Sequence, residues 1–280
     1  EVMFMKGKSK VLLVLIAVCA ALLFTGTTAL ADGEVTLHVD PATDEGYSAP
    51  DRAEGAVYNT LDDAISKANA NDTIVIDDDM TINAAVTIDK SIVLDLGGNT
   101  LTIGDNVKGR SALQFTAGKS QLQNGQIIDE RGETASVPAW IAVHVKDSVL
   151  SVSDMTIQSD CTKTITYPIR VEASGNNDAE LILNDGTVIS ESGANGTNGT
   201  YGVTLFGSNS DGTASLTVNS GVTITSSLFA ISGSGTKDNT VVTINGGTIT
   251  SLNAHAIYYP QEGDLTINGG TLDLTCNGNG

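Results

Sequence analysis

The sequence predicts an all-β fold in which the chain winds as a tube of stacked parallel coils, with three short strands in each coil. The first observation behind this prediction is a phrase of alternating apolar residues broken by an Asn- and Gly-containing turn. Its copies, from the clearest to the weakest, occupy 264–274, 242–249, 216–221, 181–188, 150–157, 120–127 and 94–101. Self-similarity of this kind is typical of a stacked repeat array.

The second observation is the spacing of two independent markers. The last apolar residue of the second strand recurs after 26, 30, 31, 35, 26 and 23 residues, at Leu96, Leu122, Val152, Leu183, Val218, Ile244 and Ile267. The first strand, which precedes it, recurs after 28, 28, 34, 26 and 28 residues, aligned on Leu113, Ile141, Ile169, Val203, Phe229 and Ile257. Hairpins would bring neighbouring strands back after about 8–12 residues. These longer periods instead favour like strands lying parallel, ~4.8 Å apart, with their apolar side chains facing the tube axis.

Composition is the third observation. Aromatic residues are only 4% of the chain and there are 30 glycines, which suits short strands with frequent turns. The formal net charge is −19, and residues 32–280 alone, with 11 basic and 32 acidic side chains, carry about −21. Such a field repels nucleic acid, so we expect no nucleic-acid partner. The two cysteines after residue 31, Cys161 and Cys276, form neither a disulfide framework nor a zinc motif.

Residues 1–31 read as a secretory signal peptide. Three lysines within 1–10 precede an apolar run from Val11 to Phe24, which is too short for a comfortable membrane span. Ala29-Leu30-Ala31 forms a small-x-small cleavage site. We therefore expect a secreted, extracellular or cell-surface protein without a membrane span once the signal is removed.

One helix is predicted in the rest of the chain. Residues 32–57 are acidic and broken by prolines and glycines, so they read as a linker with one strand at 35–39. The helix is expected at 59–70, with Thr60 as its cap, Asp63 returning a bond to the cap backbone, and one apolar face. Coils are expected from residue 72 to 280.

The turn after the second strand carries an asparagine in four successive copies. These residues are Asn184, Asn219, Asn245 and Asn268. Asparagine tolerates the left-handed backbone of a sharp corner, and stacked asparagines can bond to one another from coil to coil. We interpret them as a structural ladder.

The segment from Tyr58 to Ile74, which reads YNTLDDAISKANANDTI, resembles the N-terminal cap of right-handed parallel β-helices of the pectate-lyase-like superfamily. The Leu-Thr-Ile-Asn-Gly-Gly-Thr-Ile coils are similar to bacterial surface and adhesin-like members of that class. The resemblance spans 58–280 and implies a right-handed β-helix with a capping helix. It implies little about activity, because the class holds lyases, hydrolases and non-enzymatic adhesins.

The C-terminal end has no such cover in the sequence. Residues 271–275 form the third strand of a coil, and 277–280 form only a turn. A repeat array normally ends in a capping segment. We therefore expect a truncated sequence and a monomeric rod within a longer chain.

The resemblance implies that a catalytic site would place acidic and basic residues on one outer face. The first-strand alignment sets His144 and Glu172 at equivalent places in adjacent coils, with Arg170 on the same side and Thr204 and Tyr258 above as binding candidates. A cross-strand charge pair on a solvated face is the alternative. The Asp-pair and Gly-His-Gly motifs of the galacturonan hydrolases of this class are not seen.

A run of carboxylates could bind Ca²⁺. Asp77, Asp78 and Asp79 follow a predicted strand, but they lack the spaced ligands and glycine of an EF-hand loop, so a solvated turn is the alternative. No cofactor other than possible Ca²⁺ is expected.

The expected function is adhesin-like: an extended face that binds a carbohydrate or a cell-surface ligand. The alternative is a polysaccharide lyase or glycoside hydrolase that acts on acidic polysaccharide. A third interpretation is a spacer within a larger surface protein.

Overall fold

The computed structural model describes residues 33–42, 48–132, 139–160, 165–191 and 201–275. Val35–Gly280 form one compact unit and Glu1–Glu34 another, and every element described here belongs to the first. Within the described residues this unit is all-β apart from one helix, and its strands pair only in parallel. The predicted all-β, parallel class is confirmed.

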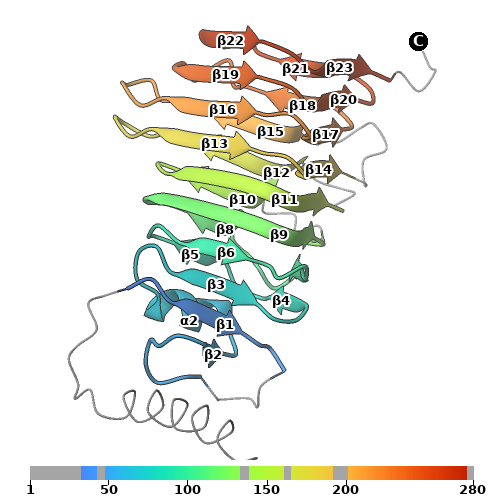
Figure 1. Ribbon diagram of the computed structural model, residues 1–280. Coiled ribbons are helices and arrows are strands. Elements are labelled where there is room, and N and C mark those ends of the chain that lie inside the picture. The colour runs from blue at the N-terminus through green and yellow to red at the C-terminus, as the bar shows by residue number, and fades with distance from the viewer. Residues whose placement is uncertain (1–32, 43–47, 133–138, 161–164, 192–200, 276–280) are drawn as a thin grey trace, which may run out of the picture. The chain divides into compact units, whose positions relative to one another are not determined.

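The larger sheet has sixteen strands, stacked one above another in Figure 1. Its path runs through β2 (Ala56–Tyr58), β1 (Thr36–Val39), β3 (Thr73–Ile76), β6 (Val93–Asp95), β9 (Lys119–Asp129), β11 (Val149–Ser159), β13 (Ala179–Leu183), β16 (Ala214–Val218), β19 (Thr240–Ile244) and β22 (Gly263–Ile267). Its side branches are β4 (Met80–Ile82), β7 (Thr100–Ile103), β14 (Val188–Glu191), β17 (Thr223–Ser226), β20 (Thr248–Ser251) and β23 (Thr271–Leu274). The branches join the path through the long strands β9 and β11.

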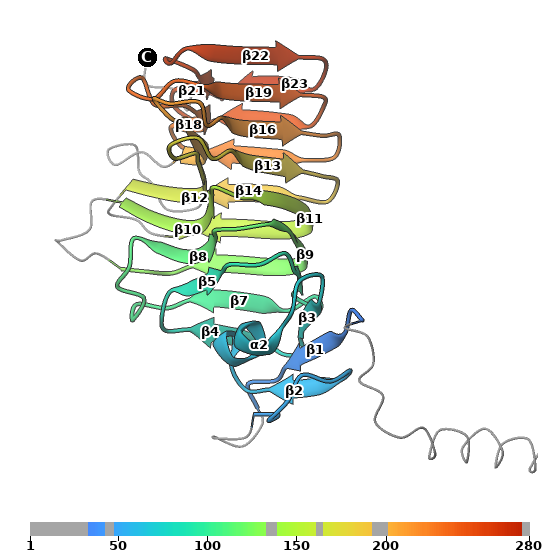
Figure 2. The same ribbon diagram turned by 90° about the vertical axis from the view of Figure 1, so that its left-hand side faces the viewer.

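The smaller sheet has seven strands. In order they are β21 (His255–Tyr258), β18 (Phe229–Ser232), β15 (Tyr201–Phe206), β12 (Ile165–Glu172), β10 (Ala139–Lys146), β8 (Ser111–Phe115) and β5 (Val86–Ile88). Successive triplets of strands pair in order: β13, β14 and β15 with β16, β17 and β18, and these with β19, β20 and β21. Figure 2 shows the strands of the two sheets rising side by side.

The register agrees with the second-strand marker from Leu122 to Ile267, whose members pair directly in sequence order. The first-strand alignment needs a correction. Val143, not Ile141, pairs with both Leu113 and Ile169. Ile231 likewise takes the place expected for Phe229, and Leu94 that of Leu96. A shift of two residues keeps every side chain on its own face, so alternation alone cannot detect it.

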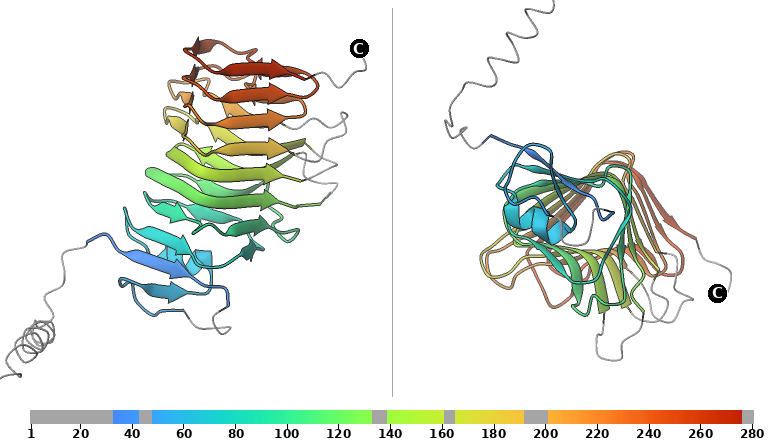
Figure 3. Two further views of the ribbon diagram at one scale, coloured as in Figure 1. Left: turned by 45° about the vertical axis from the view of Figure 1, so that its right-hand side comes forward. Right: turned by 90° about the horizontal axis from the view of Figure 1, so that it is seen from below.

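The interior is lined by the alternating apolar residues of both sheets. Leu122, Val152, Leu183 and Ile244 are fully buried. Figure 3 shows, in the end-on view, the strands surrounding this common interior. Ile267 has the same orientation but is 49% exposed, because the described residues place no further strand beside β22.

The N-terminal region joins the larger sheet more extensively than the sequence predicts. Both β1 and β2 pair in parallel, whereas the sequence predicts a single strand within a linker. The helix α2 (Leu61–Lys67) is shorter than the expected 59–70. The Thr60 hydroxyl accepts a hydrogen bond from Asp63 N at 3.2 Å, as expected of a cap. The Asp63 carboxylate accepts a bond from Ser48 Oγ at 2.9 Å.

The corners of the larger sheet use two kinds of residue for two purposes. Asn219 Nδ2 donates to Asn184 Oδ1 at 2.9 Å, Asn245 to Asn219 at 3.1 Å, and Asn268 to Asn245 at 2.9 Å. The asparagines do not have a positive φ, contrary to the left-handed role that we expected of them. The left-handed positions there belong to glycines, such as Gly247 with a φ of 85°.

Stability should depend on the inward residues of the central coils. We expect Leu183→Ala to lower the free energy of unfolding by about 2–5 kcal/mol, because it leaves a cavity between Val152 and Val218. The matched control is Thr217→Ala, an outward residue of β16 that pairs with Ile182, for which we expect a change within about 0.5 kcal/mol. Urea unfolding followed by circular dichroism measures both. Equal losses would contradict the inward assignment.

Candidate functional site

The charged cluster predicted from sequence assembles on the outer face of the smaller sheet, but in a different register. His144 pairs with Arg170, and Lys146, not His144, pairs with Glu172. The side chains nevertheless meet, because Glu172 Oε2 lies 2.6 Å from Arg170 Nη2 and 3.3 Å from His144 Nε2. The contact with His144 lacks hydrogen-bond alignment. The three side chains therefore form an ion-pair cluster across β10 and β12.

The electrostatics of this cluster keep Glu172 ionised. The contact with His144 is the largest cause that lowers the pKa of Glu172, from its ordinary 4.5 to about 2; burial opposes it, and the charge of Arg170 adds to it. Burial lowers the pKa of Arg170, while the charge of Glu172 raises it. The Arg170 guanidinium also lies 3.7 Å from the centre of the Phe206 ring. A carboxylate held in this way is a poor proton donor near neutral pH.

Sequence reasoning missed the residue on the other side of the imidazole. Ser111 Oγ lies 3.0 Å from His144 Nδ1, and both residues are buried. Ser111 opens β8, and its strand pairs directly with β10. The two-residue error in the first-strand alignment hid this contact, since it placed Ser111 opposite Ala139 and not opposite Ile141, two residues farther from His144.

The residues above the cluster are less accessible than a binding role requires. Thr204 pairs with Arg170, but it is only 2% exposed and its hydroxyl lies 2.9 Å from that of Ser232. Tyr258 pairs with Ser232 in the next strand and is 41% exposed. Of the two candidate binding residues, the structure presents only Tyr258 to solvent.

An aromatic stack borders this face. The ring centres of Tyr167 and Tyr201 are 5.0 Å apart, those of Tyr201 and Phe229 5.5 Å, and those of Phe229 and Tyr258 4.5 Å. The Phe229 and Tyr258 rings are nearly parallel, at 15°. Rings that stack on each other have less face left for a sugar. The stack therefore serves to join four neighbouring strands more than to bind a sugar.

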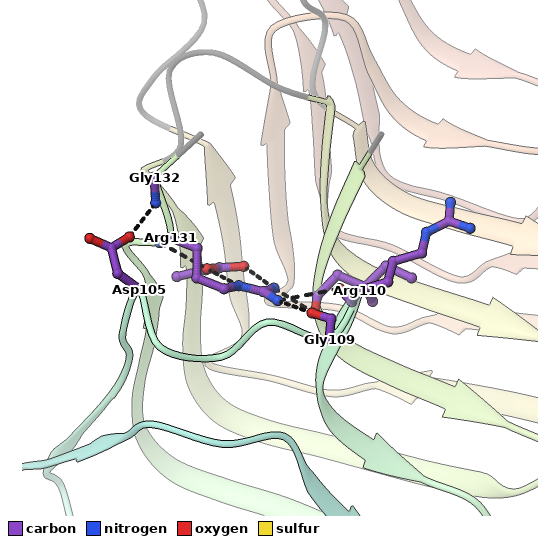
Figure 4. A network of polar contacts seen from close by, with 7 residues as sticks. Asp105, Gly109, Arg110, Arg131 and Gly132 are labelled. Atoms are coloured by element: carbon purple, nitrogen blue, oxygen red, sulfur yellow. Dashed lines mark hydrogen bonds and ion pairs between the residues drawn. The ribbon is translucent and has the colours of Figure 1, made fainter. Parts of the chain in front are cut away.

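A second network, also missed from sequence, surrounds a buried arginine. The Arg131 guanidinium forms a bidentate pair with Asp129, at 2.8 Å from Nε and 2.6 Å from Nη2, and both residues are 1% exposed. Its other N–H groups donate to the carbonyls of Gly109, Arg110 and Ile141 (Figure 4). All five donors of the side chain therefore have acceptors, and one cation joins β9 to the starts of β8 and β10.

The carboxylates proposed for Ca²⁺ make separate local contacts. Asp77 pairs with His38 Nδ1 at 2.9 Å, Asp78 Oδ1 accepts from Asp79 N at 2.8 Å, and Asp79 Oδ1 accepts from Thr100 N at 2.7 Å. The run thus links the turn after β3 to β1 and to β7.

The larger sheet presents a regular array of hydroxyl groups. In-register outward threonines form three rows, which we call the threonine rows: Thr217, Thr243 and Thr266; Thr223, Thr248 and Thr271; Thr225 and Thr250. All are at least partly exposed. Neighbouring strands set the hydroxyls ~4.8 Å apart along a row, and residues two apart on one strand lie ~6.6 Å apart.

The ionised state of Glu172 predicts a pH-dependent contribution to stability. Its folded pKa is depressed, so the stabilisation is present above pH 4.5 and is lost as pH falls towards about 2. The stability difference between the native protein and Glu172→Gln should narrow as the pH falls below 4.5. Urea midpoints at pH 7, 5, 4, 3 and 2.5 measure it. A stability difference between the two proteins that does not change with pH would contradict the depressed pKa of Glu172.

Breaking the buried ion pair between Arg131 and Asp129 should destabilise the protein. We expect Asp129→Asn to lower the free energy of unfolding by about 3–5 kcal/mol, because it leaves the buried charge of Arg131 uncompensated. The control is Arg131→Met with Asp129→Leu, which removes both charges and should cost less than the single change. Thermal unfolding at pH 7 compares them, and a smaller loss for the single variant would contradict this account.

Within the described residues, no three His, Cys, Asp or Glu side chains are grouped so that they could hold a metal ion. In the same part of the chain, no helix has the length and apolar character needed to cross a membrane. The chain matches no family model, no curated protein and no solved structure with which it was compared.

Proposed function

We propose that this protein is a secreted or cell-surface β-helix protein, adhesin-like, which uses an extended sheet face to bind a glycan or another surface ligand. The observation that carries the proposal is the set of threonine rows. They repeat one hydroxyl pattern over three successive strand levels, and a repeating ligand can meet several equivalent donors and acceptors at once. The leader at 1–31 supports export.

The finer fold is part of the same proposal. Each coil holds three strands, the winding is right-handed as in the pectate-lyase-like superfamily, and α2 covers the first coils. The ordered pairing of strand triplets supports three strands per coil. The burial of Leu61, Ala64 and Ile65 on one face of α2 supports a covering role. Pairing of β1 and β2 below β3 adds strands to the end that the helix covers.

The alternative, a lyase or hydrolase of acidic polysaccharide, has less support. Its candidate cluster holds Glu172 as an ionised partner of Arg170, so that carboxylate offers no proton to a leaving group. The net charge of −19 also repels an anionic polymer. A neutral glycan meets neither obstacle, and we therefore expect neutral ligands on the threonine rows.

A glycan array with the full chain tests the proposal. We expect binding to neutral glycans that weakens by about 5- to 150-fold in a Thr243→Lys, Thr250→Lys variant, since each of the two lost hydrogen bonds contributes about 0.5–1.5 kcal/mol. The matched control is Thr102→Lys, an outward threonine of β7 outside the threonine rows, which should bind as the native protein does. Absence of binding to any glycan, or equal loss in the control, would contradict the proposal.

A further inference from the structure

Ser111, His144 and Glu172 form a chain of side-chain contacts that lies apart from the threonine rows and extends beyond the ion pair of Glu172 with Arg170. Ser111 Oγ lies 3.0 Å from His144 Nδ1, and His144 Nε2 lies 3.3 Å from Glu172 Oε2. A hydroxyl, an imidazole and a carboxylate in this order are the parts of a nucleophile, a general base and a group that orients the base. We propose that Ser111 is a nucleophile activated by His144, with Glu172 as the positioning residue, for acyl transfer from small carboxylic esters.

One imidazole tautomer suits the order of the two contacts. If Nδ1 accepts the Ser111 proton, the ring proton is on Nε2, where it faces the Glu172 carboxylate. The distance from Ser111 Oγ to Nδ1 is within the range required for general-base catalysis, and longer, misaligned contacts such as the one at Nε2 tighten in many enzymes when substrate binds. Glu172 is unsuited to donating a proton near neutral pH, but a carboxylate that is ionised there is what the orienting role requires.

The backbone around Ser111 is held in place by a buried side chain. The buried Arg131 binds the carbonyls of Gly109 and Arg110, which directly precede Ser111, and the carbonyl of Ile141, which is in the residue paired with it. Figure 4 shows this guanidinium reaching the backbone at the start of β8. One buried group therefore fixes both strands that carry the nucleophile and the base, which is the preorganisation that catalysis needs.

The cluster also holds a spare hydrogen-bond donor. Arg170 Nε is buried and has no hydrogen-bond partner among the described residues. A buried N–H without an acceptor is unusual and costly. Ser111 is 8% exposed and His144 6% exposed, so the substrate must be small.

The chemistry needs only the ester and water. Ser111 Oγ bonds to the carbonyl carbon while its proton passes to His144 Nδ1. The ester C–O bond then breaks, and the leaving alcohol takes that proton from His144. Water attacks the acyl-Ser111 carbonyl with its proton going to His144, and the carboxylic acid leaves as the proton returns to Ser111 Oγ.

The test is labelling of the full chain with a fluorophosphonate, mapped by mass spectrometry, together with hydrolysis of p-nitrophenyl acetate. We expect the label on Ser111, no label in Ser111→Ala, and labelling slowed by about 10²-fold or more in His144→Ala. The matched control is Ser148→Ala, whose buried hydroxyl donates to a backbone carbonyl and faces no imidazole; it should label normally.

Glu172 is tested by the pH profile. Labelling of the native protein should fall at acidic pH, because a protonated imidazole cannot accept the serine proton. Glu172→Gln should change both the rate and the position of that fall, whereas Glu172→Asp should restore part of each. Folding of every variant is checked by circular dichroism. A folded native protein that takes no label on Ser111, or equal labelling rates with and without His144, would overturn the proposal.

Discussion

Parallel, in-register pairing between successive strands is the constraint on which the rest of this structure depends. Each strand places its side chains directly against the same kind of side chain in the next strand, as Leu183 does between Val152 and Val218. The backbone groups are satisfied by the same pairing, so a single rule builds the interior, the corners and the outer rows. A local error in register would move an entire set of side chains at once.

The polar features obey the same rule. The asparagine corners bond to one another because the pairing brings equivalent amides to hydrogen-bond distance, and the outward threonines align for the same reason. Arg131 departs from it. This side chain reaches from the end of β9 in the larger sheet to the starts of β8 and β10 in the smaller sheet, and all of its donors find acceptors. Without that satisfaction a buried guanidinium would be destabilising.

The fold class followed from sequence because periodicity is a property of many residues together. The second-strand register from Leu122 onwards was also predictable, since each of its apolar residues precedes a turn that contains Asn or Asp, in most copies followed by Gly. The candidate site was not. The first strands lack a corner signal, so the alignment slipped by two residues and separated Ser111 from His144. The burial of Thr204 could not be read either, because it depends on neighbours in three dimensions.

The length of chain between paired strands varies while the register does not. Leu183 and Val218 are 35 residues apart and Ile244 and Ile267 only 23, yet both pairs are matched in the same way. The number of residues between paired strands can therefore change while the pairing stays the same. The stability of such a scaffold resides in the paired strands and not in the lengths of the segments between them, so a segment of a different length can be accommodated while every paired strand keeps its partner.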